Sequence, residues 1–212
     1  MRERFLGIYT VALADILDAR GLHEQTLPPS IRPLRPGTRL AGPAFTVSGG
    51  PANPESYDAA LRKVLAMLGE VPAGHVAVYA CGQERAAHLG ELSVTSLKAR
   101  GVAGCVLDGG CRDVSFILEE DFPVFCAHIT AEDSTWRWEL EATQAPITVG
   151  TVRIEPGDWV VGDNDGVVVV PHGHAESVLA EAEEKAATES EIRAAVRDGA
   201  SPLEAYERYG TF

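Results

Sequence analysis

Arg112 and Asp113 place a fixed cation beside an anion at the end of the segment VLDGGCRD, residues 106–113. The apolar run stops at Asp108, two glycines follow, and we expect the charged pair to lie on a loop with few side chains. One interpretation is an exposed ion pair, which contributes little to stability. The other is a site in which the guanidinium holds an anionic substrate and the carboxylate holds a metal ion.

A second element that could bind an anion is formed by Gly90, Glu91, Leu92 and Ser93. They are predicted to begin a helix, where unpaired backbone N–H groups and the positive end of the helix dipole favour negative charge. The dipole alone would also explain a Glu in this first turn. In a parallel sheet this helix start and the Arg112 loop would lie at the carboxyl ends of two strands, the edge where open α/β sheets bind ligands.

These residues need elements to position them, and the chain supplies an alternation of helices and strands. An amphipathic helix ending at Gly21 is predicted first, with Phe5, Ile8, Leu13, Ile16 and Leu17 at helical spacing. A strand is expected over 38–50, and a helix over 54–69 with Pro54 near its start and Gly69 at its end. Short apolar strands are then expected at 75–81, 104–109 and 122–128, with a helix over 91–101 between the first two.

The last third of the chain changes character. Residues 146–171 are β-rich, with Pro-Gly-Asp and Asp-Asn-Asp-Gly turns. A long helix is predicted over 174–198, and a short one is opened by a capping box at 201–204. The pattern predicts an α/β fold with a central sheet flanked by helices, in a single layered domain over residues 1–212.

Charge and composition exclude several classes of function. The net charge of −13 disfavours binding to nucleic acid or to an anionic membrane surface. The sequence has neither an apolar segment long enough to span a bilayer nor a recognisable leader, so we expect a cytoplasmic protein. Four cysteines without C-x-x-C spacing indicate neither a disulfide framework nor a zinc site. The glycine patterns of dinucleotide, P-loop and nucleophile-elbow sites are not found.

The sequence blocks, taken in order, resemble the class II 4-hydroxy-4-methyl-2-oxoglutarate aldolases and the related RraA-type regulators of ribonuclease E. The resemblance rests on TVALADILDARG, RLAGPAFTV, GELSVTSLKARGVAGCVLDGGCRD, FPVF and PGDWVVGDNDGVVVVP. It implies a layered β/β/α domain of the swivelling-domain type. The family pattern is an acidic residue, about twenty positions and then Arg-Asp; here Glu91 is followed by 20 residues and then Arg112 and Asp113. Several members of the family have Asp where this chain has Glu91.

The resemblance also implies roles for individual residues. The backbone of residues 90–93 would bind the carboxylate of a small 2-oxo acid, and Arg112 would contact the keto or enolate oxygen. Asp113 would bind Mg²⁺ or Mn²⁺, partly through water. Such a site would stabilise a pyruvate enolate as its negative charge develops. Glu91, Arg112 and Asp113 are therefore the predicted catalytic residues.

One further carboxylate comes from periodicity. In the long C-terminal helix Glu189 lies on an otherwise apolar stripe, where an unpaired charge is costly to bury. It could be a salt-bridged edge residue. Alternatively, residues 174–210 pack on a neighbouring subunit and Glu189 reaches that subunit's metal site, which the resemblance favours because it implies a trimer or hexamer.

Two functions of different classes follow. The first is a metal-dependent lyase that cleaves a 4-hydroxy-2-oxo acid such as 4-hydroxy-4-methyl-2-oxoglutarate to pyruvate and that could also decarboxylate oxaloacetate. The second is a non-catalytic regulator that binds an Arg-rich region of a ribonuclease through its acidic surface. The complete set of predicted anion and metal groups favours the enzyme.

Overall fold

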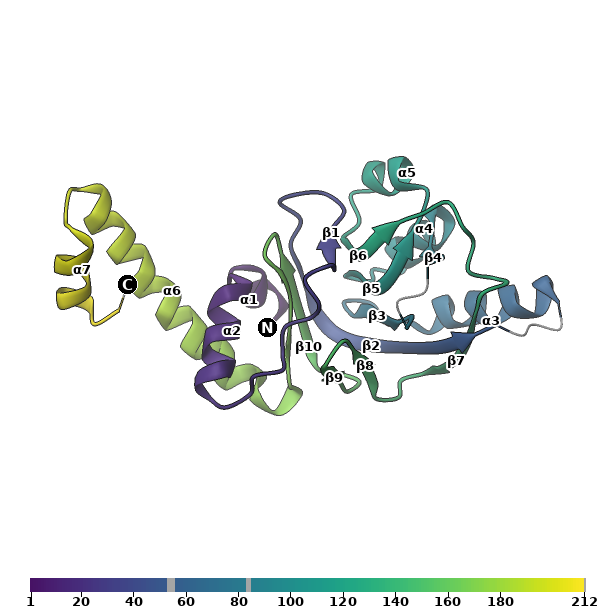
Figure 1. The fold of residues 1–212 in the computed structure, drawn as a ribbon, viewed down its shortest axis with the longest axis horizontal. Coiled ribbons are helices and arrows are strands. Elements are labelled where there is room, and N and C mark those ends of the chain that lie inside the picture. Colours follow the sequence, from purple (N-terminus) through teal and green to yellow (C-terminus); the bar gives the residue numbers. More distant parts are fainter. Residues whose placement is uncertain (53–55, 83–84, 212) are drawn as a thin grey trace.

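The computed structural model describes residues 1–52, 56–82 and 85–211. Its centre is a mixed sheet in which seven strands follow the order β1-β6-β5-β3-β2-β10-β11, while β4 pairs with β5 and β7 with β2. Helices lie on both sides of this sheet, as Figure 1 shows. The predicted α/β class, with a central sheet flanked by helices, is therefore confirmed.

The parallel part of the sheet consists of β2 (Leu40–Pro51), β3 (Val76–Ala80), β5 (Gly104–Cys111) and β6 (Val124–Ile129). The short β4 (Ala87–Leu89) pairs in parallel with the end of β5. Apolar side chains line both faces of β3 and β5, as expected for strands covered on both sides. This part of the sheet fixes the edge at which the predicted site residues lie.

The remaining strands are antiparallel. β10 (Trp159–Asp163) pairs with both β2 and β11 (Gly166–Val170), β7 (Trp138–Thr143) with β2, and β1 (Arg32–Pro33) with β6. β8 (Ile147–Val149) and β9 (Val152–Ile154) form a separate hairpin. Arg32 on β1 donates to the carbonyl of Asp165, beside β11, at 2.6 Å, so the two edges of the sheet approach each other and nearly close it.

Helices cover two different parts of the sheet. α3 (Tyr57–Glu70), α4 (Glu91–Ala99) and α5 (Val114–Glu119) bury their apolar faces on the parallel strands. α1 (Arg2–Leu6), α2 (Thr10–Ala19) and the first half of α6 (Ala175–Arg197) pack on β10 and β11. A 3-10 turn (His172–His174) precedes α6, and α7 (Pro202–Tyr209) follows it. Among the described helices, none has both the length and the apolar character to cross a membrane.

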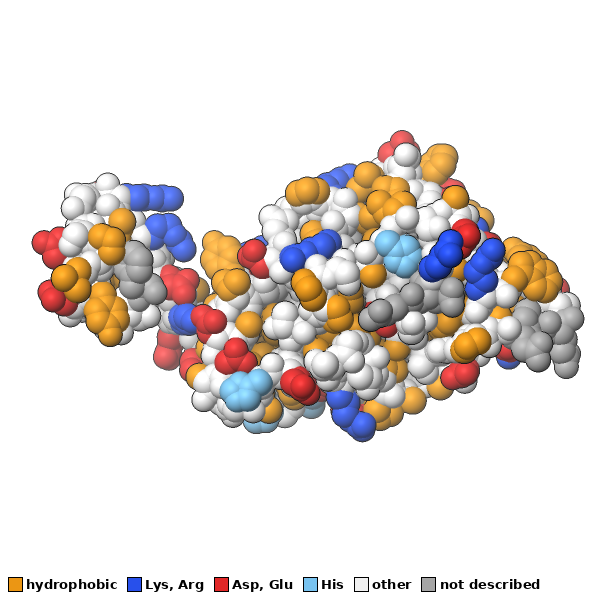
Figure 2. Space-filling model, in the orientation of Figure 1, with side chains coloured by type: hydrophobic (Ala, Val, Ile, Leu, Met, Phe, Trp, Pro, Cys, Tyr) orange, Lys and Arg blue, Asp and Glu red, His pale blue; other side chains and the backbone are white. Residues whose placement is uncertain are grey.

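The end of α6 and α7 project from the body of the molecule (Figure 1). The predicted capping box of α7 is present, since the Ser201 hydroxyl accepts from the amide of Glu204 while the Glu204 carboxylate accepts from the amide of Ser201. Hydrophobic side chains lie exposed on this projecting part (Figure 2), and they include Leu203 and Tyr206.

The structure corrects several predicted boundaries. The single N-terminal helix is two helices, because the chain is extended at Tyr9 and the amide and hydroxyl of Thr10 bond to the Asp163 carboxylate at 2.9 and 2.7 Å. Residues 110–111 were expected in a loop but continue β5. Strands β4 and β7 and helix α5 were not predicted. Pro54 lies outside the described residues, and Gly69 lies inside α3 rather than at its end.

The contact between Thr10 and Asp163 joins the N-terminal helices to the sheet and generates a prediction about stability. Asp163 is 7% exposed and also accepts from the amide of Asp165 at 2.9 Å. Asp163→Ala leaves buried donors without an acceptor and is expected to lower the free energy of unfolding by about 2–3 kcal/mol. Urea denaturation measures this loss. Asp165→Ala, at an exposed position two residues away, is the matched control; an equal loss in both variants would contradict the assignment.

Candidate active site

The parallel pairing of β4 and β5 brings the predicted anion-binding residues together. Leu89 lies opposite Cys111 in the register, and the amide of Arg112 donates to the Leu89 carbonyl at 3.0 Å. Gly90 and Arg112 therefore leave the sheet side by side, one entering α4 and the other α5. The predicted proximity of these two segments is present in the structure.

A side chain at position 90 would crowd the Arg112 and Asp113 side chains. A Cβ atom there would lie 2.6 Å from Oδ2 of Asp113 and 3.4 Å from Cγ and Nε of Arg112. The two glycines of the VLDGGCRD segment lie against histidine rings. A Cβ at Gly109 would lie 2.7 Å from Nδ1 of His88, and one at Gly110 would lie 2.7 Å from Nε2 of His128.

The backbone of Asp113 turns its carboxylate toward α4. Asp113 has φ 58° and ψ 34°, a left-handed conformation that Asp tolerates better than most residues. It occupies the N-cap position of α5, yet its side chain does not cap that helix. Instead, Oδ2 accepts from the amide of Glu91 at 3.2 Å, so one amide of the predicted anion site already faces this carboxylate.

Arg112 is held between two carboxylates. Nη1 donates to Oδ2 of Asp133 at 2.8 Å, and Nε lies 3.7 Å from Oδ2 of Asp113. Oδ1 of Asp133 accepts from the amide and the hydroxyl of Thr135 at 2.7 and 2.6 Å. Although partial burial raises the pKa of Asp133, the bonds from Thr135 and the Arg112 charge outweigh it and lower the pKa below its usual value. Asp133 is thus an ionised anchor that fixes the guanidinium in place.

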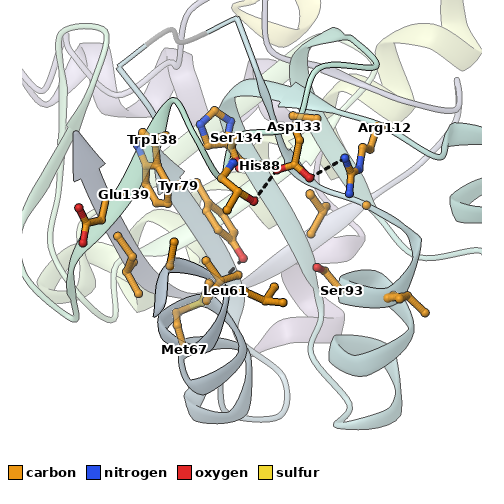
Figure 3. Close-up of a pocket in the computed structure, with 18 of the residues that line it drawn as sticks. Leu61, Met67, Tyr79, His88, Ser93, Arg112, Asp133, Ser134, Trp138 and Glu139 are labelled. Carbon is orange, nitrogen blue, oxygen red and sulfur yellow. Dashed lines mark hydrogen bonds and ion pairs between the residues drawn. The ribbon is translucent and has the colours of Figure 1, made fainter. Parts of the chain in front are cut away.

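A cavity of about 150 Å³ opens beside these groups, and Figure 3 shows its labelled side chains. One end is formed by Gly90, Leu92, Ser93, Arg112, Asp113 and Asp133, which include most of the predicted site residues. The other end lies between α3, β3 and β7 and is lined by Leu61, Val64, Met67, Tyr79, Trp138 and Leu140. The cavity therefore joins a charged end to a mainly apolar one.

Sequence reasoning missed His88, which also lines the cavity. It is 8% exposed, and its ring meets Trp138 edge-on with centroids 5.0 Å apart. Burial lowers the pKa of His88 to about 4, with a smaller contribution from His128, so the ring is neutral at neutral pH. The Ala86 carbonyl acts on this pKa in the opposite direction, but no described residue makes a hydrogen bond of normal geometry to either ring nitrogen or to Nε1 of Trp138.

Sequence reasoning also missed Asp133. Its one local signal is the motif Asp-Ser-Thr, in which the Asp carboxylate can accept from the residue two positions on, as it does here from Thr135. That motif indicates a turn but not a contact with Arg112, which lies 21 residues earlier.

The described residues contain no group of three or more His, Cys, Asp or Glu side chains arranged to hold a metal ion. Asp113 remains compatible with a cation that keeps most of its water, because its carboxylate is 42% exposed and lies beside the cavity. Glu189 is half-buried on the far part of α6, at the other end of the molecule from α4 (Figure 1), so within one chain it does not join this site.

Comparison with known proteins finds relatives that match most of the chain. A protein of Halalkalibacterium halodurans, provisionally named 4-hydroxy-4-methyl-2-oxoglutarate aldolase, is 33% identical over 96% of this chain and 91% of its own length. An uncharacterised protein of Pseudomonas syringae pv. tomato DC3000 matches with a TM-score of 0.88 and 29% identity, over 99% of this chain and 95% of that one.

A third similar protein carries a different functional name. The crystal structure of Streptomyces coelicolor RraAS2, described as an unusual member of the RNase ES inhibitor RraA protein family, matches with a TM-score of 0.80 and 30% identity. That match covers 90% of this chain and 94% of the other. A family model described as RraA-like, Aldolase/RraA, matches residues 10–169. The chain therefore belongs to the RraA-like family.

Proposed function

We propose that this protein is a lyase that depends on a divalent metal ion and cleaves a 4-hydroxy-2-oxo acid, such as 4-hydroxy-4-methyl-2-oxoglutarate, to release pyruvate. The observation that carries the proposal is the convergence of the α4 N-terminus, Arg112 and Asp113 at one end of a cavity. The aldolase name of the Halalkalibacterium relative supports it.

The substrate carboxylate is assigned to the start of α4. The first amides of a helix have no partner within the helix, and the dipole adds positive potential there. Gly90 is the N-cap residue of α4 and has no side chain that could bond to the first amides of the helix. Leu92 and Ser93 line the cavity. The amide of Glu91 already donates to Asp113, so the substrate carboxylate would be bound by the other amides of residues 90–93. This would place the 2-oxo oxygen near the Arg112 guanidinium.

Arg112 then acts where negative charge develops. Breaking the bond between C3 and C4 leaves its electron pair in an enolate whose oxygen is the former 2-oxo oxygen. A guanidinium already held by Asp133 stabilises that oxygen without having to reorient during the reaction. Protonation at C3 completes pyruvate. Decarboxylation of oxaloacetate forms the same enolate, so the same residues would support it.

The C4 hydroxyl must lose its proton as the second product becomes a carbonyl compound. Glu91 lies in the first turn of α4, beside the Asp113 carboxylate that its amide contacts. We assign Glu91 the positioning of the water molecule that accepts this proton. Asp113 would hold the divalent cation, Mg²⁺ or Mn²⁺, which supplies additional positive charge beside the enolate oxygen when bound.

We further propose that the chain assembles as a trimer or hexamer in which α6 and α7 contact a neighbour. Leu203 and Tyr206 are 65% and 55% exposed on the projecting part, a large apolar exposure for such a small element. In that arrangement Glu189 could reach the metal site of the neighbour. Sedimentation velocity measures the assembly, and a monomer at micromolar concentration would count against this role for Glu189.

The experiment that tests the activity couples pyruvate release to NADH oxidation by lactate dehydrogenase. Turnover of 4-hydroxy-4-methyl-2-oxoglutarate and of oxaloacetate is expected with Mg²⁺ or Mn²⁺ and is expected to cease with EDTA. If a panel of 4-hydroxy-2-oxo acids gives no pyruvate with either metal, the proposal is wrong.

The alternative function is the binding of a ribonuclease. It is favoured by the similarity to RraAS2 and by the net charge of −13, which would attract an Arg-rich segment. Binding of a purified ribonuclease that weakens steeply with salt, together with absence of pyruvate release, would favour this alternative. The positioned Arg112 and the adjoining cavity favour the enzyme.

Asp133 is predicted to act as a positioning residue. Asp133→Asn keeps an oxygen for Thr135 but replaces the ion pair with Arg112 by a neutral amide, so we expect kcat to fall about tenfold with a smaller change in KM. Steady-state kinetics of pyruvate release measure the effect. Glu132→Gln removes the neighbouring carboxylate, which pairs with Arg85 and Arg137. Equal effects of the two substitutions would argue against a specific role for Asp133.

Asp113→Asn tests the metal site without changing the shape of the side chain. Asn also tolerates the left-handed conformation and can still accept from the amide of Glu91, so the fold is expected to stay intact. Loss of the negative charge should weaken Mn²⁺ binding by tenfold or more, on the order of the losses found when metal sites are altered. Isothermal titration calorimetry measures the affinity.

The control for this variant is Asp121→Asn, because Asp121 is also left-handed, with φ 51°, but pairs with Arg35 outside the cavity. Unchanged Mn²⁺ affinity in Asp113→Asn would remove Asp113 from the metal site. Circular dichroism melting of both variants checks that neither loses its structure.

A further inference from the structure

The apolar end of the cavity contains polar atoms that the proposed chemistry does not use. Both ring nitrogens of His88 and Nε1 of Trp138 are buried, and no described residue makes a hydrogen bond of normal geometry to any of them. His88 is 8% and Trp138 5% exposed. Buried polar groups in proteins are nearly always paired, so three unpaired nitrogens on two touching side chains call for a partner outside the described chain.

The His88 ring is held in place by its surroundings. It lies over Gly109, where a Cβ atom would come within 2.7 Å of Nδ1, and it meets Trp138 at an interplanar angle of 87°. Its low pKa keeps it neutral, so one ring nitrogen donates and the other accepts. Together with the indole N–H, these atoms suit a hydroxyl group, which can both donate and accept.

The position of His88 matches the length of the proposed substrate. His88 and Gly90 are two residues apart on an extended segment, so they face the same side, about 6.6 Å apart along the chain. A substrate whose carboxylate is bound at the start of α4 and whose C4 points along β4 toward His88 would bring its C4 hydroxyl toward that ring.

The surroundings of this end favour an uncharged group over a second carboxylate. This end is lined by Leu61, Val64 and Met67 from α3 and by Leu140 from β7. The Tyr79 hydroxyl donates a long hydrogen bond to the Met67 sulfur, at 3.8 Å. Figure 3 shows Tyr79, Met67 and Leu61 on the side of the cavity away from Arg112. Among the described lining residues Arg112 is the one cation, whereas Glu139 at this end is an anion paired with Lys63.

We propose that this end of the cavity is the specificity subsite, in which His88 and the Trp138 indole bind the C4 hydroxyl and the α3 and β7 side chains take an uncharged C4 substituent. The preferred substrates are then 4-hydroxy-2-oxo acids with a single carboxylate, and 4-hydroxy-4-methyl-2-oxoglutarate, which has a second carboxylate on C4, would be cleaved with lower kcat/KM. This inference rests on the proposed lyase function. It follows from the neutral donors and the apolar wall, since a buried carboxylate without a cation is costly.

The test compares two substrates that differ in one group. 4-Hydroxy-2-oxopentanoate has a methyl group at C4 where 4-hydroxy-2-oxoglutarate has a carboxylate of similar size. We expect kcat/KM for pyruvate release to favour the former about tenfold or more. Equal values, or preference for the dicarboxylate, would overturn the subsite while leaving the lyase function standing. Absence of pyruvate from both substrates would instead overturn the lyase function.

Binding provides a readout that does not need turnover. Pyruvate, 2-oxopentanoate and 2-oxoglutarate lack the C4 hydroxyl and are not cleaved, but they share the 2-oxo carboxylate. Isothermal titration calorimetry with Mg²⁺ present is expected to rank 2-oxopentanoate about tenfold tighter than 2-oxoglutarate. The reverse order would contradict an apolar subsite independently of any activity.

Two variants test the residues themselves. His88→Phe keeps an aromatic ring against Trp138 but removes both nitrogens. It should raise KM for 4-hydroxy-2-oxopentanoate about tenfold and leave pyruvate affinity unchanged. His75→Phe, at a partly exposed position just before β3 and outside the cavity lining, is the control. Leu61→Lys adds a cation to the cavity wall and should shift the kcat/KM ratio toward the dicarboxylate. An unchanged KM in His88→Phe together with an unchanged ratio in Leu61→Lys would exclude the subsite.

Discussion

The close parallel contact between the ends of β4 and β5 is the constraint on which the candidate site depends. It places Gly90 and Arg112 side by side, and it leaves so little space that a Cβ atom at position 90 would meet the Asp113 carboxylate at 2.6 Å. The left-handed turn at Asp113 is part of the same arrangement, because it turns the carboxylate away from α5 and onto the first amide of α4. A helix start, a cation and an anion are thereby joined in one short stretch of backbone.

The balance of charge at this contact favours an additional cation. Arg112 is the one positive side chain among the described cavity residues, and it faces the carboxylates of Asp113 and Asp133 with Glu91 close by. An anionic 2-oxo acid would add further negative charge to a site where solvent is partly excluded. The amides of α4 and a hydrated divalent cation at Asp113 would offset it, which is consistent with the proposed metal dependence.

The sequence predicted those parts of the site that depend on local rules. Strand ends followed by a helix start and by Arg-Asp were enough to place residues 90–93 beside Arg112 and Asp113, because parallel strands end at one edge. Asp133, His88 and Trp138 were missed because their contacts depend on long-range packing. The same applies to the break in the N-terminal helix, which is fixed by an acceptor 153 residues away at Asp163. Hydrophobic periodicity continues across that break and contains no information about it.

The two ends of the cavity are formed by different helices and strands. This separation suggests how one fold can serve relatives that carry different functional names. The charged end is made by β4, β5 and α4, whereas the apolar end is made largely by α3 and by β7, which pairs with β2. Substitutions on α3 or β7 can therefore alter which substrate fits without moving Arg112 or Asp113. Because the helices and strands around the charged end are required by the sheet itself, a relative could keep that end after losing catalysis. The side chains of the apolar end therefore carry the information about the ligand.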